Sequence, residues 1–330
     1  MKKWIKRLTV LAGLAALAGA GGLAWYGNRP LRIEPLPKTF NVAPGTQLRG
    51  LSATLAREGV VGNAQVFWLL GRVLGKGGTL KAGIYTLDKP LTPLELYAKL
   101  ERGEVSLALV QFIDGWNWRE VRAVLAAQPL LKNDSAGMSD AEVLQAIGAE
   151  EAHPEGLLFP DTYFYAPHTS DIQVLRRAYR LQRAKLMAAW ETRAAGLPYR
   201  TPYEALIMAS IVEKETGAAS ERPLIAGVFL NRLRLGMRLQ TDPTVIYGLG
   251  ERFDGNLRKI DLQRDTPYNT YTRAGLPPTP IAMPSEAAIQ AALHPAKTDA
   301  LYFVACGDGT HVFSNNLAAH NRAVNRYQRR

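Results

Sequence analysis

The sequence predicts an α+β protein with a transmembrane helix at its N-terminus and two folded parts after it. An uncharged apolar run opens the chain, short strand-like and helix-like patterns then alternate, and turns rich in Gly and Pro separate them. Of the 330 residues, 47% are hydrophobic and 21% are charged, as in ordinary globular proteins. Intrinsic disorder is therefore excluded for most of the chain.

The first element is an uncharged run of 19 residues, Leu8–Tyr26, which follows four basic residues in the segment MKKWIKR. A helix of that length covers about 28 Å, close to the hydrocarbon thickness of a bilayer. Since basic residues stay in the cytoplasm, we expect residues 1–27 to be a cytoplasmic N-terminus and a transmembrane helix, with the rest exported. A signal peptide cleaved near Ala18–Ala20 is the alternative, because small residues at this spacing resemble a cleavage site.

The exported part divides into three segments by its patterns. Residues 28–38 hold three prolines and are predicted to be an extended linker. Residues 39–152 alternate short strands and capped helices and end in a polar stretch, which predicts a small α+β module and a connector. Residues 153–330 are predicted to form an α+β domain with a long helix, two capped helices, a loop-rich stretch and a hairpin around Gly307–Gly309.

Composition excludes several kinds of site. The single cysteine, Cys306, leaves no internal disulfide and no thiolate metal cluster. The five histidines include no short ligand pair, so neither a metal nor a cofactor is predicted. The net charge is +11, but four basic residues stand in the first seven and no basic run or zinc-finger spacing follows. No nucleic-acid partner is therefore expected.

The segment TPYEALIMASIVEKETG (201–217) carries the candidate chemistry. A capping box at its start and Gly217 at its end predict a helix, with Glu213 and Glu215 in the last turn. At about 100° per residue, Glu215 continues the apolar face of the helix and Glu213 points to another side. An apolar setting and the negative end of the helix dipole both raise the pKa of a carboxyl, so Glu215 is the predicted general acid. The alternative is a solvated helix end.

Two later segments, residues 237–248 and 266–289, are rich in Gln, Thr, Asn and Tyr and carry little charge. Amides and hydroxyls beside aromatic rings suit a sugar polymer, which needs hydrogen bonds and flat apolar faces. Ordinary turns are the alternative, because the same residues form turns. The candidate substrate-binding residues are Gln240, Thr241, Asp242, Tyr268, Asn269, Thr270 and Tyr271.

A series of motifs follows in order along the chain: EGLLFPDTY (155–163), IVEKET, NRLRLGMRLQTDPTVIYG, YNTY, GLPP, HPA, LYFV and a closing HN. Together they resemble the motifs of the YceG-like (MltG) endolytic murein transglycosylases, over essentially the whole chain after the linker. The chain departs from the family at Thr279 and Ser285, where the family often has glycine.

The resemblance implies a single-pass inner-membrane protein with a LysM-like module and a catalytic domain in the periplasm. It implies endolytic cleavage of the MurNAc–GlcNAc bond in peptidoglycan, which forms 1,6-anhydro-MurNAc ends and limits or terminates the elongation of nascent strands, without a cofactor. The family's catalytic glutamate is the second one of its E-K-E-T motif, here Glu215. The implied partners are peptidoglycan strands, the inner membrane and, as candidates, peptidoglycan synthases such as penicillin-binding proteins.

Two other functions stay open. The first is a muramidase hydrolase that uses Asp242 as a second carboxylate and leaves a reducing muramic end. The second is a non-catalytic scaffold that binds peptidoglycan within the machinery of cell-wall synthesis.

Overall fold

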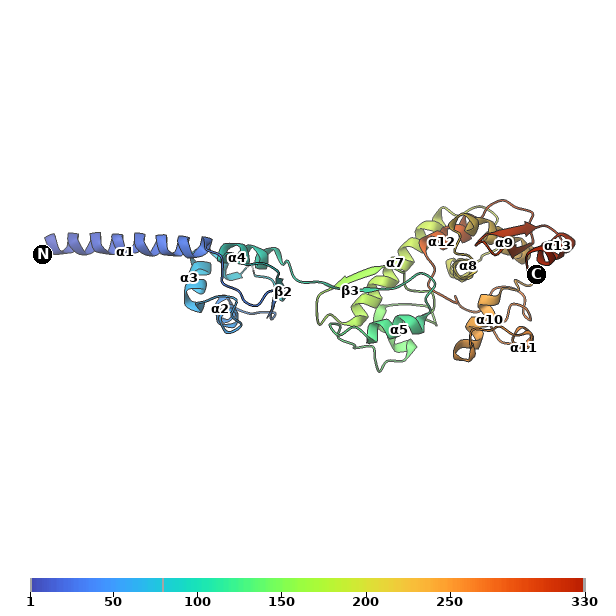
Figure 1. Ribbon diagram of the computed structural model, residues 1–330, viewed down its shortest axis with the longest axis horizontal. Coiled ribbons are helices and arrows are strands. Elements are labelled where there is room, and N and C mark those ends of the chain that lie inside the picture. The colour runs from blue at the N-terminus through green and yellow to red at the C-terminus, as the bar shows by residue number, and fades with distance from the viewer. Residues whose placement is uncertain (1, 79, 329–330) are drawn as a thin grey trace. The chain divides into compact units, whose positions relative to one another are not determined.

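The computed structural model describes residues 2–78 and 80–328, and it is α+β as predicted (Figure 1). For residues 2, 3, 5, 6, 8, 9 and 12 only the backbone is described. The chain forms two compact units. The N-terminal unit holds Met1–Ala108 and Tyr165–His168, and the C-terminal unit holds Leu109–Phe164 and Thr169–Arg330.

The N-terminal unit combines helices with one two-stranded antiparallel sheet, in which Phe40 stands opposite Tyr85. Helix α4 shows how the sequence sets the boundaries: Thr92 and Glu95 form a capping box, and Gly103 ends the helix in the left-handed conformation. The elements are α1 (Lys2–Asn28), β1 (Lys38–Val42), α2 (Leu48–Arg57), α3 (Ala64–Val73), η1 (Lys76–Gly78), β2 (Gly83–Leu87) and α4 (Pro93–Arg102).

The predicted membrane span lies in α1. Within the part of the chain that the structure describes, no helix has both the length and the apolar character of a membrane span. The transmembrane helix over Leu8–Tyr26 is therefore not confirmed, and three side chains of that run, at positions 8, 9 and 12, lie outside the description.

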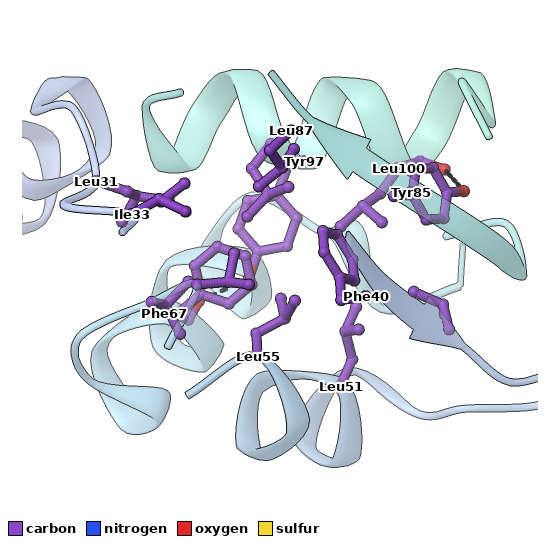
Figure 2. Close-up of a cluster of buried hydrophobic side chains, with 14 of the residues drawn as sticks. Leu31, Ile33, Phe40, Leu51, Leu55, Phe67, Tyr85, Leu87, Tyr97 and Leu100 are labelled. Carbon is purple, nitrogen blue, oxygen red and sulfur yellow. Dashed lines mark hydrogen bonds between the residues drawn. The ribbon is translucent and has the colours of Figure 1, made fainter. Parts of the chain in front are cut away.

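Aromatic pairs organise the core of the N-terminal unit (Figure 2). Phe67 stacks on Tyr97 with ring centroids 4.3 Å apart, and the Tyr97 hydroxyl donates to the Phe67 carbonyl oxygen at 2.7 Å. Phe40 stacks on Tyr85 across the sheet. The Tyr85 hydroxyl also has an acceptor, because it donates to the carbonyl oxygen of Lys81 at 2.7 Å.

The segment predicted to be a linker, residues 28–38, partly belongs to this core. Leu31 and Ile33 are 7% and 2% exposed, and both lie in the cluster of Figure 2. The Leu31 amide also donates to the Leu91 carbonyl oxygen at 2.9 Å. The backbone bends at residues 35–37, so the segment is not extended throughout, and its apolar side chains Leu31 and Ile33 are buried. Helix α1 therefore joins the unit without a free spacer.

The C-terminal unit is mainly helical, with one strand pair, β3–β4, and one antiparallel hairpin, β5–β6, at the predicted place. Helices α7, α9 and α12 pack against α8 (Figure 1). Its elements are β3 (Ala108–Gln111), α5 (Trp118–Ala126), α6 (Asp140–Ile147), β4 (Thr162–Tyr165), α7 (Asp171–Glu191), α8 (Pro202–Glu215), η2 (Ala219–Glu221), α9 (Arg222–Arg234), α10 (Asp242–Leu249), η3 (Gly250–Arg252), α11 (Lys259–Gln263), α12 (Glu286–Leu293), β5 (Tyr302–Ala305), β6 (His311–Ser314) and α13 (Leu317–Tyr327).

The boundary between the units differs from the one expected at residue 152. Residues 109–152 pack with the C-terminal unit, because their backbone bonds reach later segments. The Phe112 amide donates to the Asp161 carbonyl oxygen at 3.0 Å, and the Gly115 amide donates to that of Met283 at 2.8 Å. Such non-local bonds leave no trace in a local sequence pattern.

Gly71 of α3 tests the packing in Figure 2. A Cβ at Gly71 would lie 2.3 Å from the Tyr97 hydroxyl oxygen, so Gly71→Ala should displace that ring and cost about 1–3 kcal/mol of unfolding free energy. Gly62→Ala is the control, since nothing lies within 4 Å of the added carbon. Denaturant unfolding followed by circular dichroism measures both. Equal stability of the two variants would contradict this packing.

Candidate active site

Helix α8 places the candidate acid. Thr201 caps its start by accepting from the Glu204 amide, Pro202 occupies the first turn, and the helix ends at Glu215. Every residue from Ala205 to Val212 is buried, so the middle of the helix is enclosed on all sides, while Lys214 in the last turn is exposed. No separate apolar stripe therefore distinguishes the side of α8 that carries Glu215 from the side that carries Glu213.

Glu215 lies half-buried at the edge of a cleft of about 520 Å³, which we call the acid cleft. Thr241 Oγ1 donates to Glu215 Oε1 at 3.1 Å. Burial raises the pKa of Glu215 to about 7, the Thr241 hydrogen bond opposes this shift, and the charge of Asp242 adds to it. A carboxyl with this pKa can give up a proton and take one back near neutral pH.

Glu213 has a different environment. Its side chain is 6% exposed, and Oε2 accepts from both the amide and the hydroxyl of Ser285, the N-cap residue of α12. Its other oxygen lies 3.5 Å from the guanidinium of Arg222. Glu213 thus fastens the start of α12 to the end of α8. Contacts, rather than helix face, separate the two acids: the oxygens of Glu213 are occupied, and Glu215 faces the acid cleft.

The acid cleft contains four residues predicted from sequence, Glu215, Gln240, Asp242 and Tyr271. The Tyr271 hydroxyl donates to Asp242 Oδ1, and burial, then Asp242, raises the pKa of Tyr271. Gln240 holds a left-handed backbone with φ of 51°, and its amide donates to the Thr270 carbonyl oxygen at 3.1 Å. A non-glycine residue in this conformation is a mark of functional loops.

Sequence reasoning missed Arg232, Tyr302 and His320, which also line the acid cleft. Arg232 is 8% exposed and donates to the carbonyl oxygens of Leu239 and Leu301 at 2.9 and 2.7 Å. It therefore ties α9 to the loop that carries Gln240. Nothing in the sequence separates this buried arginine from its neighbour Arg234, because both stand in the same basic helix end.

Three of the predicted binding residues are buried and form hydrogen bonds within the loops. Thr241, Asn269 and Thr270 are 1%, 0% and 2% exposed. Asn269 donates to the carbonyl oxygens of Asp261, Leu262 and Arg264. Thr270 Oγ1 accepts from the Thr241 amide at 3.1 Å. These contacts hold the 266–273 loop against the start of α10 and so fix the Thr241 hydroxyl beside Glu215.

Tyr268 lies elsewhere, in a second and larger cleft of about 970 Å³. We call it the Trp118 cleft, and residues such as Trp118, Arg122, Glu155, Lys214, Tyr247 and Tyr268 line it. Tyr268 meets Tyr247 edge to face, and its hydroxyl shares a hydrogen bond of 2.9 Å with Thr279, one of the two departures from the family.

Glu155 is a buried carboxyl in the Trp118 cleft that the sequence analysis did not select as a site residue. Its two oxygens accept from the Trp118 amide at 3.0 and 3.1 Å, and Oε2 accepts from the Tyr247 hydroxyl at 3.0 Å. Burial raises the pKa of Glu155 to about 7, against these hydrogen bonds. Because its oxygens already have donors from α5 and α10, Glu155 joins two elements, whereas Glu215 has one donor and an open side.

Metal ligation was also considered. In the described ranges, 2–78 and 80–328, no three His, Cys, Asp or Glu side chains are grouped so that they could hold a metal ion.

Comparisons with known proteins agree over most of the chain. The YceG-like family model matches residues 40–326. A curated Bacillus subtilis (strain 168) protein named endolytic murein transglycosylase is 31% identical over 328 residues, covering 93% of this chain and 90% of its own length. A protein of the same name from Streptococcus pneumoniae (strain D39) is 28% identical, covering 98% of this chain and 65% of that relative. A crystal structure of a YceG-like protein from Listeria monocytogenes matches with TM-score 0.55 and 31% identity, covering 86% of this chain and 98% of that one.

The raised pKa of Glu215 predicts a pH-dependent cost to stability. Its pKa rises from 4.5 to about 7 on folding, so the folded state loses stability as the pH rises between these values. Glu215→Gln removes that cost. At pH 8 the variant should exceed wild type by on the order of 1–3 kcal/mol in unfolding free energy, and the gain should fade near pH 4. Denaturant unfolding across this pH range measures it.

Glu213→Gln is the matched control in the same turn. It keeps an acceptor for Ser285 but loses the charge that faces Arg222, so it should lower stability at pH 8. A Glu215→Gln protein that is less stable than wild type at pH 8 would contradict the assigned environment of Glu215.

Proposed function

This chain belongs to the YceG-like family, and we propose that it cleaves peptidoglycan as an endolytic murein transglycosylase with Glu215 as its single acid and base. The two curated relatives bear that activity as their name, and the family model spans residues 40–326. The observation that carries the role of Glu215 is its position: one carboxyl with a pKa of about 7 at the edge of the acid cleft, held by Thr241.

The first half of the reaction uses the protonated acid. Glu215 gives its proton to the oxygen that links C1 of a muramic acid residue to the next glucosamine, and the C1–O bond breaks. Positive charge grows on the muramic ring, and the ring's own N-acetyl group and nearby dipoles stabilise it. The protonated fraction of Glu215 falls as the pH rises through about 7, so the step suits neutral and mildly acidic conditions.

The second half uses the carboxylate. Glu215 takes the proton of the C6 hydroxyl on the same sugar, and O6 bonds to C1 to close the 1,6-anhydro ring. The proton count balances, and no water, metal or cofactor is consumed. One carboxylate suffices because the nucleophile is already tethered to the reacting ring. The Thr241 hydroxyl stabilises the charged form and keeps the carboxylate oriented between the two transfers.

Neither alternative function is favoured. A hydrolase would need a second carboxylate that activates water, and the two curated relatives are named as transglycosylases. A non-catalytic scaffold leaves the raised pKa of Glu215 without a use, and the curated relatives are named as enzymes.

The chemistry predicts the effect of Glu215→Gln. The amide keeps the size of the side chain but cannot donate or retrieve the proton, so the rate should fall on the order of 10²–10⁴-fold or more. The measurement is release of anhydro-muropeptides from purified sacculi, resolved by mass spectrometry, beside a sacculus-binding assay in which the variant should still bind.

Glu213→Gln is again the control, and its rate of release is divided by the fraction of the variant that is folded. It should release anhydro products at a rate near wild type, because Glu213 contacts Ser285 and Arg222 rather than the acid cleft. An inactive Glu213→Gln protein, or near-normal release by Glu215→Gln, would overturn the assignment. Reducing muramic ends would indicate hydrolysis.

We also propose the localisation that the sequence suggests: a single-pass inner-membrane protein with its C-terminal unit in the periplasm, where peptidoglycan lies. The uncharged run Leu8–Tyr26 and the preceding basic residues support it, as do exposed apolar side chains of α1 such as Leu14 and Leu17, at 58% and 71%. A LysM-like role for the N-terminal unit and contact with peptidoglycan synthases rest on the family resemblance and are proposals of the same kind.

Localisation has a direct test. A reporter fused after Arg330 should be active only outside the cytoplasm, and the protein should fractionate with membranes and resist extraction by salt. A mature protein that begins near Gly19 or Gly21 in the soluble periplasmic fraction would overturn the anchor.

A further inference from the structure

The Trp118 cleft has no part in the chemistry above, although it is the larger of the two clefts. It lies wholly in the C-terminal unit, where α5, α10 and the end of α8 contribute to its lining. Trp118, Tyr247 and Tyr268 give it aromatic surface, and cations stand around them.

Two of these cations have no counter-charge. Arg122 donates to the Met138 carbonyl oxygen, lies over the Trp118 ring, and has a buried Nη1 without a hydrogen-bond partner. Lys214 donates to the Gly115 carbonyl oxygen at 3.2 Å. Among the described residues no carboxylate lies within ion-pair distance of either side chain. A cation at a cleft without an anion beside it favours an anionic ligand.

The two carboxyls that line the cleft, Asp140 and Glu155, accept from neutral donors of the same cleft and pair with neither cation. Asp140 accepts from the Trp118 indole at 2.7 Å, and Glu155 accepts from the Trp118 amide and the Tyr247 hydroxyl. The cleft therefore presents two unpaired cations beside aromatic rings. That lining suits a chain with carboxylates and apolar groups, such as a short acidic peptide.

The Trp118 cleft begins next to the acid. Lys214 lines it and Glu215 lines the acid cleft, while at the start of α10 Asp242 lines the acid cleft and Pro243 the Trp118 cleft. Because sequence neighbours line the two clefts, both lie beside the end of α8 and the start of α10. A peptide of several residues, at up to about 3.3–3.6 Å per residue, is long enough to extend from a sugar at Glu215 toward the Trp118 cleft.

We propose that the Trp118 cleft binds the peptide stem of the muramic acid residue that is cleaved, with Arg122 and Lys214 pairing with the carboxylates of that stem. The proposal rests on the proposed function, since only a peptidoglycan strand carries such a stem at the reacting sugar. The enzyme then selects strands whose stems keep free carboxylates.

The test compares two substrates of the same length: peptide-bearing strands, and the same strands with stem carboxylates converted to amides. Full-length protein in detergent is assayed for kcat/KM on each. Wild type should prefer the charged strands by about three- to tenfold, as two partly exposed ion pairs allow, and the preference should shrink as salt rises. In the double variant Arg122→Gln and Lys214→Gln the ratio should approach one.

Lys297→Gln is the matched control, because this exposed lysine of the same unit lines neither cleft, and its ratio should stay at the wild-type value. Three results would overturn the proposal: a wild-type ratio near one, an unchanged ratio in the double variant, or an equal loss on both substrates, which indicates a positioning role. If the double variant unfolds, Lys214→Gln alone should lower the ratio.

Binding separates this proposal from the proposed function. In a Glu215→Gln background, strand affinity is measured by sedimentation without any cleavage, and charged strands should bind about three- to tenfold more tightly than amidated ones. A wild-type protein that cleaves neither strand while this binding preference persists would refute the proposed function and retain the stem site. Cleavage that yields anhydro products but shows no preference between the two strands would support the proposed function and refute the stem site.

Discussion

The burial of the middle of α8, Ala205–Val212, is the constraint on which the rest of the C-terminal unit depends. Helices α7, α9 and α12 pack against α8, whose residues from Ala205 to Val212 are all buried, so the two carboxyls of its last turn follow a buried segment and are largely shielded from water, although Lys214 between them is exposed. Glu213 is neutralised by partners and becomes a fastening point for α12. Glu215 has a single hydroxyl donor, and the low dielectric raises its pKa toward neutrality. Burial thus makes Glu213 a structural contact between α8 and α12 and makes Glu215 a proton donor.

The loops around the acid are built to keep that environment fixed. Asn269 satisfies three carbonyl oxygens of the chain before it, and Thr270 holds the Thr241 backbone. Arg232 adds bonds from α9 to the same loop. Buried polar side chains that are fully bonded specify one arrangement, because every alternative leaves a donor or acceptor unpaired. The position of the Thr241 hydroxyl beside Glu215 is therefore set by a network rather than by one contact.

Local patterns in the sequence predicted the α+β class, the Thr201 cap of α8, the β5–β6 hairpin and the loops that carry Gln240 and Tyr271, although Glu204 binds Arg200 instead of completing the capping box. Non-local contacts were out of reach. Nothing near Leu31 indicates that its side chain enters a core, and nothing near Gly115 indicates a bond to Met283. The choice of Glu215 agreed with the family motif, but the helix face alone does not separate Glu215 from Glu213, because α8 is buried on all sides from Ala205 to Val212. Glu155 and Arg232 owe their importance to partners that are distant in sequence.

The way α1 enters the N-terminal unit has a mechanical consequence. Its last turn packs against the unit, where Leu70 and Leu94 lie close to Gly27, and the chain then continues into the core through Leu31 and Ile33. Because buried side chains connect α1 to the rest of the N-terminal unit, the end of α1 can change its angle to that unit only if the packing of the core changes. A force on α1 therefore reaches the buried core of the N-terminal unit directly, because no exposed linker separates the helix from that core.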